Sequence, residues 1–192
     1  MKCVTIINIK LRREDIMPGF VIHLATANEY IRKHPNEIKN KTDFTKGSIA
    51  PDLTTKEGKK ITHYGPSSAE VGLRNYLVKN DIKSDYDKGY FLHLITDYLF
   101  YNKLLECTSK EIYNDYDILN DFLIQKYEVK IPKEIENNVF YKSGDTKILS
   151  KELAEETIDL SSQNLLQEIK DEILKTTYTE KWDKIRKLIR LD

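Results

Sequence analysis

Residues 89–101 read GYFLHLITDYLFY, a stretch that is apolar or aromatic at almost every position but contains a histidine and an aspartate four residues apart. On a helix, His93 and Asp97 share one face with Tyr90 and Tyr101, while the remaining faces are apolar. A helix that is apolar all round lies buried in a protein. We therefore expect an all-α helical bundle built around a central buried helix that carries His93 and Asp97.

Helical spacing of apolar residues continues on both sides of this stretch, and no segment shows strand-like alternation of useful length. The spacing predicts helices over 18–33, 67–79, 85–106 and 109–127, a short helix from Pro132, and helices through much of 150–191. Glycines and prolines between residues 42 and 66 predict a long irregular connection with one short helical turn.

The composition limits the classes of function. A chain of 192 residues is long enough for one domain with a sizeable core. Its 31 basic and 31 acidic side chains leave no net charge and are interleaved, so we expect no nucleic-acid partner. Cys3 and Cys107 lie far apart without CxxC spacing, which fits a cytoplasmic protein without a disulfide scaffold. No apolar run approaches the roughly 20 residues of a membrane span, and no targeting segment is visible.

Residues 1–16 differ in character from the helical pattern that begins at Met17. Residues 12–15 can be encoded by purine-rich codons typical of a bacterial ribosome-binding site, so we hypothesise that translation starts at Met17. The alternative is a short N-terminal strand, since VTIINI is apolar and β-branched. Mass spectrometry of the native protein decides between them, because an intact N-terminus at Met1 contradicts the hypothesis.

Residues 17–192 are expected to form a single helical domain with two halves. Residues 17–107 make up the half that carries the candidate metal site. Residues 108–192 form a helical C-terminal half, which either caps the site or makes a homo-oligomer through exposed apolar stripes.

The buried pair on the central helix has two explanations. Burying an uncompensated carboxylate costs several kcal/mol, so Asp97 needs a partner. In the first explanation, His93 and Asp97 hydrogen-bond to each other or to a tyrosine as a structural network. In the second, their spacing points both side chains at one cation, as histidine pairs at this spacing do on zinc-enzyme helices.

The other histidines bear on this choice. His23 also lies inside an apolar helix, and His63 lies in the long connection, 11 residues after Asp52. Considered alone, His23 would more commonly be a core histidine with its hydrogen bonds satisfied. Asp52 alone would more commonly be a surface aspartate in a turn. His34 precedes a proline at a polar helix end, and we exclude it from the site.

Five residues follow one another in the order His23, Asp52, His63, His93 and Asp97. This order resembles the first part of the zinc-dependent phospholipase C family, which is related in fold to the single-strand-specific zinc nucleases. The matching elements are His23 on an early helix, Gly47-x-x-x-Pro51-Asp52, His63, and Gly89-x-x-x-His93-x-x-x-Asp97. They span roughly residues 17–105. The resemblance implies a helical fold with a zinc site formed by His23, Asp52, His63, His93 and Asp97.

The chain also departs from the family. Its members use three zinc ions and take further ligands from downstream histidines, a glutamate and a mature N-terminal tryptophan. Here no histidine follows His93, and the only tryptophan is Trp182. We therefore expect a reduced site with one metal ion, or with two ions bridged by Asp97 and completed by carboxylates such as Asp117 or Asp121.

The ligand types predict hydrolytic chemistry. Three imidazoles and two carboxylates suit Zn²⁺ and would also accept Fe²⁺ or Mn²⁺. Such a cation activates water for attack on phosphorus, so we expect a phosphoester substrate, which the resemblance suggests is lipid-derived. Asp52 is the candidate general base, because a loop carboxylate can orient the water. Tyr64, Tyr90 and Tyr101 are candidates for binding phosphate oxygens or for hydrogen bonds to the ligands, although core packing is the commoner role of such tyrosines.

Two other classes of protein are alternatives to this hydrolase. An HD-type phosphohydrolase needs an adjacent His-Asp pair, and no histidine in the chain is followed by aspartate. The remaining alternative is a non-catalytic helical binding or structural module, held together by a metal ion or by a buried His/Asp network. Such a module loses stability on chelation but hydrolyses no ester.

Overall fold

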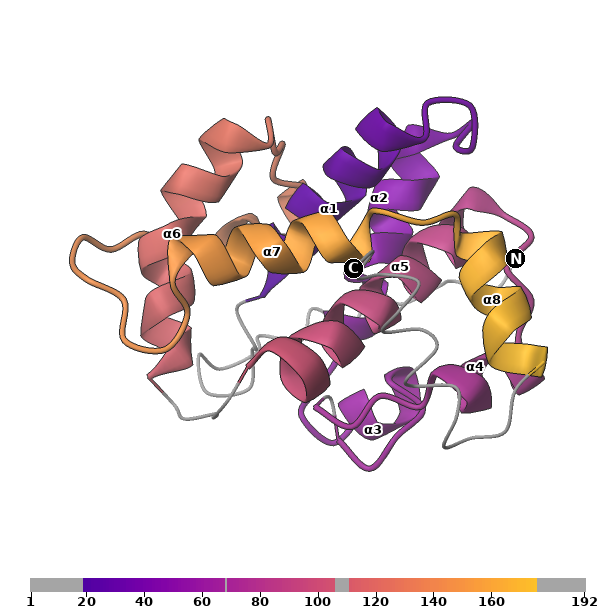
Figure 1. Ribbon diagram of the computed structural model, residues 1–192. Helices are drawn as coiled ribbons and strands as arrows, with labels where there is room; N and C mark the ends of the chain where they lie inside the picture. Colours follow the sequence, from indigo (N-terminus) through magenta and orange to yellow (C-terminus); the bar gives the residue numbers. More distant parts are fainter. Residues whose placement is uncertain (1–18, 68, 106–110, 176–192) are drawn as a thin grey trace, which may run out of the picture.

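The computed structural model describes residues 19–67, 69–105 and 111–175 (Figure 1). Every regular element in these ranges is helical, which confirms the all-α class. The α-helices are α1 (Phe20–Lys33), α2 (Lys41–Ile49), α3 (Lys59–Thr62), α4 (Leu73–Lys79), α5 (Asp85–Leu99), α6 (Ile112–Lys126), α7 (Lys151–Ser161) and α8 (Leu166–Lys175). Shorter helical segments are η1 (Ala50–Asp52), η2 (Phe100–Leu104) and η3 (Lys133–Asn138). The predictions about residues 1–16, Cys3, Met17, Cys107 and Trp182 lie outside the described residues.

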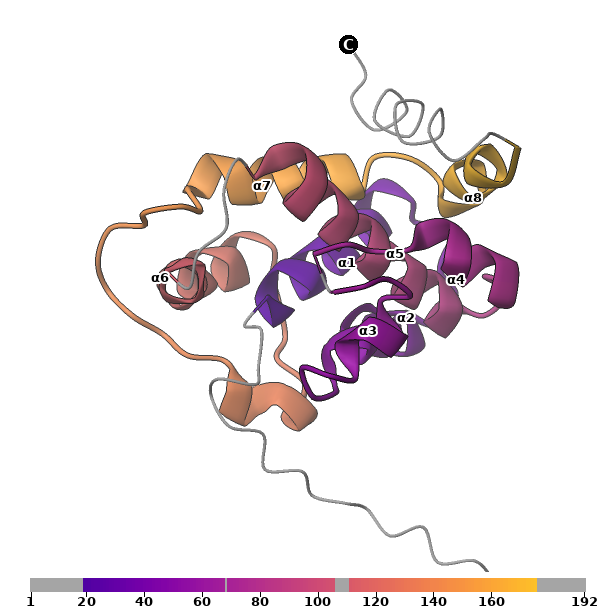
Figure 2. The ribbon, with the colours of Figure 1, turned by 90° about the horizontal axis from the view of Figure 1, so that it is seen from below.

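Helix α5 packs against most of the other helices. It contacts α1, α2, α4, α7 and α8, and every residue from 91 to 99 is buried. In Figures 1 and 2, α6 lies at one end of the molecule and α8 at the other, with α5 between them. The C-terminal half covers the N-terminal half, since α6 and α7 both pack on α1.

Polar caps fix where the helices around the site begin. The Ser84 hydroxyl accepts a hydrogen bond from the Asp87 amide at 3.1 Å, and the Asp87 carboxylate accepts one from the Ser84 amide at 3.0 Å. This capping box starts α5 directly after Ser84. The Asn40 side chain caps α2 in the same way, accepting a hydrogen bond from the Asp43 amide.

Helices α2 and α5 cross with their backbones almost in contact. A Cβ atom added to Gly47 would lie 2.1 Å from the carbonyl oxygen of Tyr86. A Cβ atom added to Gly89 would lie 2.0 Å from the carbonyl oxygen of Phe44. Only glycine fits at these two positions, which are the glycines of the two sequence motifs.

Several segments differ from the expectation from sequence. Residues 42–66, predicted as an irregular connection with one short turn, lie largely in α2, η1 and α3. The buried Phe44 and Ile49 hold α2 in the core, but too few apolar residues accompany them to give a clear helical pattern. The helix predicted over 67–79 begins only at Leu73, because the preceding segment folds back and the Gly72 amide bonds to the His63 carbonyl oxygen at 3.0 Å.

The predicted 85–106 helix also changes form near its end. It is α-helical to Leu99 and continues as the π-helical η2 from Phe100 to Leu104. The Leu105 amide accordingly bonds to the carbonyl oxygen of Phe100. Single π turns of this kind often lie at functional sites.

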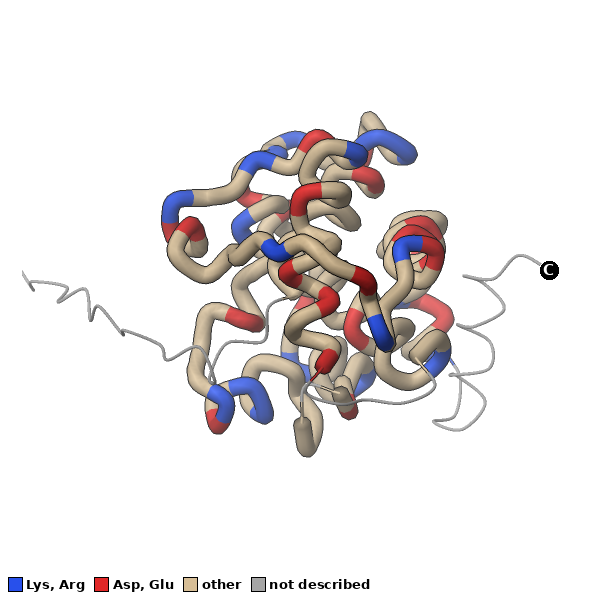
Figure 3. Tube along the Cα trace, turned by 90° about the vertical axis from the view of Figure 1, so that its left-hand side faces the viewer, with Lys and Arg blue, Asp and Glu red and all other residues tan. Residues whose placement is uncertain are grey.

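Charged positions of both signs are distributed over the molecule. Figure 3 shows Lys and Arg interspersed with Asp and Glu along the chain, without a face that gathers one sign in this view. Within the part of the chain that the structure describes, no helix combines the length and the apolar character that a membrane crossing requires.

Candidate metal centre

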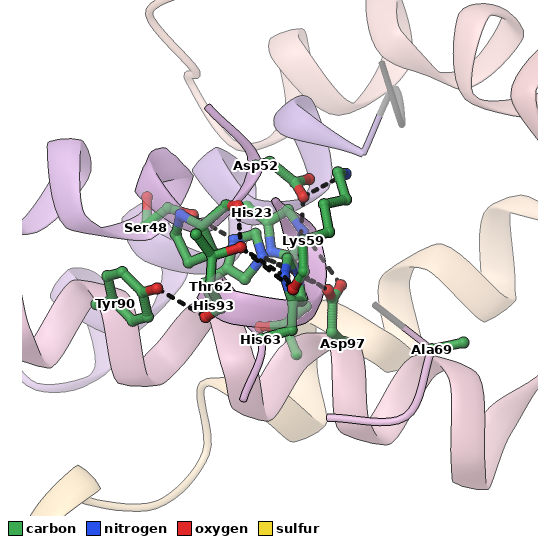
Figure 4. A network of polar contacts seen from close by, with 12 residues as sticks. His23, Ser48, Asp52, Lys59, Thr62, His63, Ala69, Tyr90, His93 and Asp97 are labelled. Carbon is green, nitrogen blue, oxygen red and sulfur yellow. Dashed lines mark hydrogen bonds and ion pairs between the residues drawn. The ribbon is translucent and has the colours of Figure 1, made fainter. Parts of the chain in front are cut away.

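Five side chains from four elements meet at one buried point (Figure 4). His23 comes from α1, Asp52 ends η1, His63 follows α3, and His93 and Asp97 lie one turn apart on α5. None of the five is more than 7% exposed. The structure thus brings together the five residues expected to form the zinc site.

Three ligand atoms form a compact triangle. The Nε2 atom of His63 lies 3.0 Å from Oδ2 of Asp97, and Nε2 of His93 lies 3.4 Å from the same oxygen. The two Nε2 atoms are 3.3 Å apart. Tetrahedral ligand atoms about 2.0–2.1 Å from a zinc ion lie about 3.3–3.4 Å from one another. The triangle therefore has the dimensions of one face of a zinc coordination sphere.

Backbone carbonyls fix the tautomers of two of the imidazoles. Nδ1 of His93 lies 2.8 Å from the Ser48 carbonyl oxygen, and Nδ1 of His63 lies 3.0 Å from the Lys59 carbonyl oxygen. A carbonyl oxygen only accepts, so both Nδ1 atoms carry hydrogen, and the neutral rings present Nε2 lone pairs to each other and to Asp97. Lone pairs and a carboxylate repel at these distances. Either a metal ion or additional protons must lie between them.

His23 lies beside the triangle. Its Nε2 atom is 3.3 Å from Oδ1 of Asp97, and its ring stacks on that of His93 with centroids 3.7 Å apart. Among the described residues, its buried Nδ1 atom has no hydrogen-bond partner. The two oxygens of Asp97 thus face different imidazoles.

Asp52 lies on the other side, where it pairs with a residue that the sequence did not indicate. Its Oδ1 atom is 3.6 Å from Nε2 of His63 and 2.5 Å from Nζ of Lys59. Lys59 is buried, whereas the adjacent Lys60 is exposed. Because the two neighbours are the same residue type, the sequence contained no signal that would single out Lys59.

Electrostatics keep both carboxylates ionised. Burial raises the pKa of Asp97, but in the metal-free protein the positive charges of protonated His93 and His23 outweigh it, so the pKa lies well below its ordinary value. Burial also raises the pKa of Asp52, but the Lys59 ammonium and, in the metal-free protein, protonated His93 lower it further than burial raises it. The ionised form is the one that binds a metal ion.

A small cavity lies against the cluster. Its volume is about 10 Å³, and the residues that line it include His23, Asp52, Asp97, Tyr101 and Tyr116. This is close to the smallest space that holds a water molecule. Burial raises the pKa of Tyr101 well above its ordinary value and also raises that of Tyr116, so both phenols stay protonated. The C-terminal half contributes to this wall, since Tyr116 belongs to α6.

The three predicted tyrosines have different surroundings. Tyr101 lines the cavity. The Tyr90 hydroxyl donates to the Thr62 carbonyl oxygen at 2.7 Å and so braces the end of α3 next to His63. The Tyr64 hydroxyl instead accepts a hydrogen bond from Asn80 at 3.0 Å. Of the three, Tyr101 is the one that faces the cavity.

The further carboxylates proposed as ligands from the sequence, and His34, lie outside the cluster. Asp117 pairs with Lys142 at 3.1 Å, and Asp121 accepts a hydrogen bond from its helical neighbour Gln125. Neither belongs to the clusters of candidate ligands found among the described residues. His34, which the sequence does not place in the site, is the C-cap residue of α1. Its Nε2 atom lies 3.0 Å from the main-chain carbonyl oxygen of Ser162, just after α7.

Comparisons of the chain with protein-family models, with curated proteins and with solved structures found no match. The fold and the site define the chain as an all-α protein with a buried cluster of three histidines and two aspartates that could hold a metal ion.

Proposed function

We propose that the chain is a metal-dependent hydrolase of a phosphoester, with Zn²⁺ as the cation and Fe²⁺ or Mn²⁺ as alternatives. The observation that carries the proposal is the triangle of His63 Nε2, His93 Nε2 and Asp97 Oδ2, whose edges of 3.0–3.4 Å suit one metal ion. The backbone bonds to both Nδ1 atoms support it, because they leave the Nε2 lone pairs for a metal.

His63, His93 and Asp97 would hold a divalent cation, which would lower the pKa of nearby water and offset negative charge on phosphoryl oxygens. The side chains of the cavity supply the rest of the chemistry. Ionised Asp52 accepts a hydrogen bond from a water molecule in the cavity and orients it for attack. The protonated Tyr101, on the same wall, shares a side-chain hydrogen bond with Tyr116 and would exchange it to donate to that water or to a substrate oxygen.

The phosphoester class rests on the order of the motifs. His23, the Gly47 to Asp52 motif, His63, and the helix with His93 and Asp97 follow one another as in the zinc-dependent phospholipase C family. A lipid-derived substrate follows from the same resemblance.

One observation favours a second candidate function, a structural metal or a proton-bridged network in a non-catalytic module. The five side chains are almost fully buried, and a cavity of about 10 Å³ admits water but no phosphoester. In that case the cluster would only stabilise the fold.

Elemental analysis of the purified protein, followed by an assay with bis(p-nitrophenyl) phosphate, separates the two functions. The hydrolase should lose activity on chelation and regain it with Zn²⁺, Mn²⁺ or Fe²⁺. Asp52→Asn should lower the rate about 10²–10⁴-fold while the protein still retains metal. Metal-dependent stability without hydrolysis of this or a lipid phosphoester would instead establish the structural function.

A further inference from the structure

Lys59 forms an ion pair with Asp52 inside the protein, at the edge of the candidate metal centre. Nζ and Oδ1 are 2.5 Å apart, and both side chains are only 4% exposed. A buried ammonium is costly to desolvate unless a negative partner compensates it. Its presence beside a cluster of candidate metal ligands therefore needs an explanation.

The local backbone holds this lysine in place. Lys59 and His63 lie one helical turn apart, and the Lys59 carbonyl oxygen accepts the Nδ1 hydrogen of His63. The Thr62 hydroxyl donates to the carbonyl oxygen of Pro51 at 2.8 Å, which ties α3 to the segment with Asp52. The ammonium and His63 are thus positioned by the same short helix.

The ligand atoms could be divided between two metal ions. One group contains His23, His93 and Asp97, and the other contains Asp52, His63 and His93. Both groups contain His93, whose Nε2 lone pair binds only one ion, so a second ion beside His23, His93 and Asp97 would depend on Asp52 and His63. The Asp52 oxygen that faces His63 is also the atom that Lys59 contacts, so a second cation there would lie against an ammonium.

The balance of charge also favours a single metal ion. The positive charge of a single divalent ion together with the Lys59 ammonium already exceeds the negative charge of the two carboxylates of the cluster. A second divalent ion would leave a large uncompensated positive charge in a buried region, where such charges are strongly disfavoured.

We propose that the Lys59 ammonium takes the place of a second metal ion, so that the centre binds one cation and Asp52 stays outside its coordination sphere. The inference rests on the metal binding of the proposed function but not on phosphoester hydrolysis. Lys59 is a positioning residue in this scheme, because it acts through Asp52.

The test is the stoichiometry of Zn²⁺ binding to the full chain, measured by elemental analysis after dialysis against buffered Zn²⁺. We expect one equivalent for the wild type. Lys59→Met removes the charge but keeps the length of the side chain, so it should free Asp52 and double the bound metal. Lys60→Met is the matched control, because Lys60 is the exposed neighbour, and it should bind one equivalent.

The double variant Asp52→Asn with Lys59→Met should return to one equivalent, which a general loosening of the fold would not produce. If Lys59→Met does not keep its helical circular dichroism, Lys59→Gln replaces it. Two equivalents in the wild type, or one in a folded variant without the Lys59 charge, would overturn the inference, as would a wild type without metal. One equivalent without phosphoester hydrolysis supports the inference and overturns only the proposed function.

Discussion

His93 and His34 carry the same ring in opposite settings. His93 is buried against Asp97, whereas His34 is partly exposed at the end of α1. His93→Ala should abolish metal retention and lower the free energy of unfolding by about 3–5 kcal/mol, because Asp97 stays buried without its cation. His34→Ala should cost about 1 kcal/mol, the value of one hydrogen bond, and leave the metal content unchanged. Urea unfolding together with elemental analysis measures both effects.

A structural pair of His93 and Asp97 would also be weakened by His93→Ala, so stability alone does not separate the two explanations. Metal content does. If the wild type contains no stoichiometric metal and both variants match it in the phosphoester assay, the hydrolase proposal fails and only the helical fold remains.

The depressed pKa of Asp97 predicts how stability depends on pH in the chelated protein. The unfolded aspartate has a pKa of about 3.9, and the folded one lies well below it. The contribution of Asp97 to stability is therefore fully present above the unfolded pKa and is lost as pH falls through the folded value. Urea unfolding between neutral and acidic pH should show this loss, and Asp97→Asn should reduce the slope. An unchanged slope contradicts the prediction.

At the residue scale, the sequence identified candidate ligands where an ionisable side chain stands among apolar neighbours. His93 and Asp97 in an apolar helix could be identified because burial of such groups requires a partner. Lys59 could not, because lysines are common and only the fold determines that Lys59 is buried and Lys60 is not. The carbonyl oxygens that fix the tautomers are likewise invisible in a sequence, since every residue has one.

The crossing of α2 and α5 gives a prediction at the scale of elements. Gly89→Ala places a methyl group 2.0 Å from the Phe44 carbonyl oxygen, so the two helices must separate. We expect the free energy of unfolding to fall by about 3 kcal/mol or more, because backbone atoms cannot move aside as a side chain would. Denaturant unfolding monitored by circular dichroism measures the change.

Gly19→Ala is the matched control. A Cβ atom there would lie 3.6 Å from the nearest heavy atom, an ordinary contact, so the cost should be about 1 kcal/mol or less, as at other helix starts. Equal stability of Gly89→Ala and the wild type would show that the helices are not held this close.

The elements were predictable in proportion to the strength of their apolar pattern. Helix α1 and the start of α5 lie close to their predicted bounds, since apolar residues and caps mark them clearly. The helices within residues 42–66 were missed because their lysines, threonines and glycines resemble a loop, and tertiary packing overrides that local preference. The π-helical end of α5 has no sequence signature comparable to a cap.

For the whole molecule, the candidate metal should tie together α1, α5 and the segment from η1 to the end of α3. Zn²⁺ at about 100 times its dissociation constant should raise the free energy of unfolding by about 2.7 kcal/mol, because only the folded chain assembles the ligands. Thermal unfolding with chelator and after return of Zn²⁺ measures this shift. Identical melting temperatures in both conditions would count against any metal, structural or catalytic.

The class of the fold followed from helical periodicity, but the arrangement of the helices did not. Capping of the site by residues 108–192 was one of two alternatives from the sequence, but no pattern indicated that α6 and α7 would pack on α1 or that Tyr116 would reach the cavity beside Asp97. Such contacts depend on the complementary surfaces of whole helices. For the same reason, the five candidate ligands could be named from the sequence while the distances between them could not.

The carbonyl acceptors at residues 48 and 59 also affect how this chain tolerates mutation. Each ring is oriented by the path of the main chain and not by a replaceable carboxylate or amide. A substitution at position 48 that preserves the helix and is small enough for its buried setting therefore leaves the imidazole nitrogen of His93 pointing inward. A homologous chain with another residue at position 48 can still present the same imidazole nitrogen, and at position 59 only the role of the ammonium depends on lysine, so conservation of the two acceptors should be sought in backbone geometry and not in residue identity.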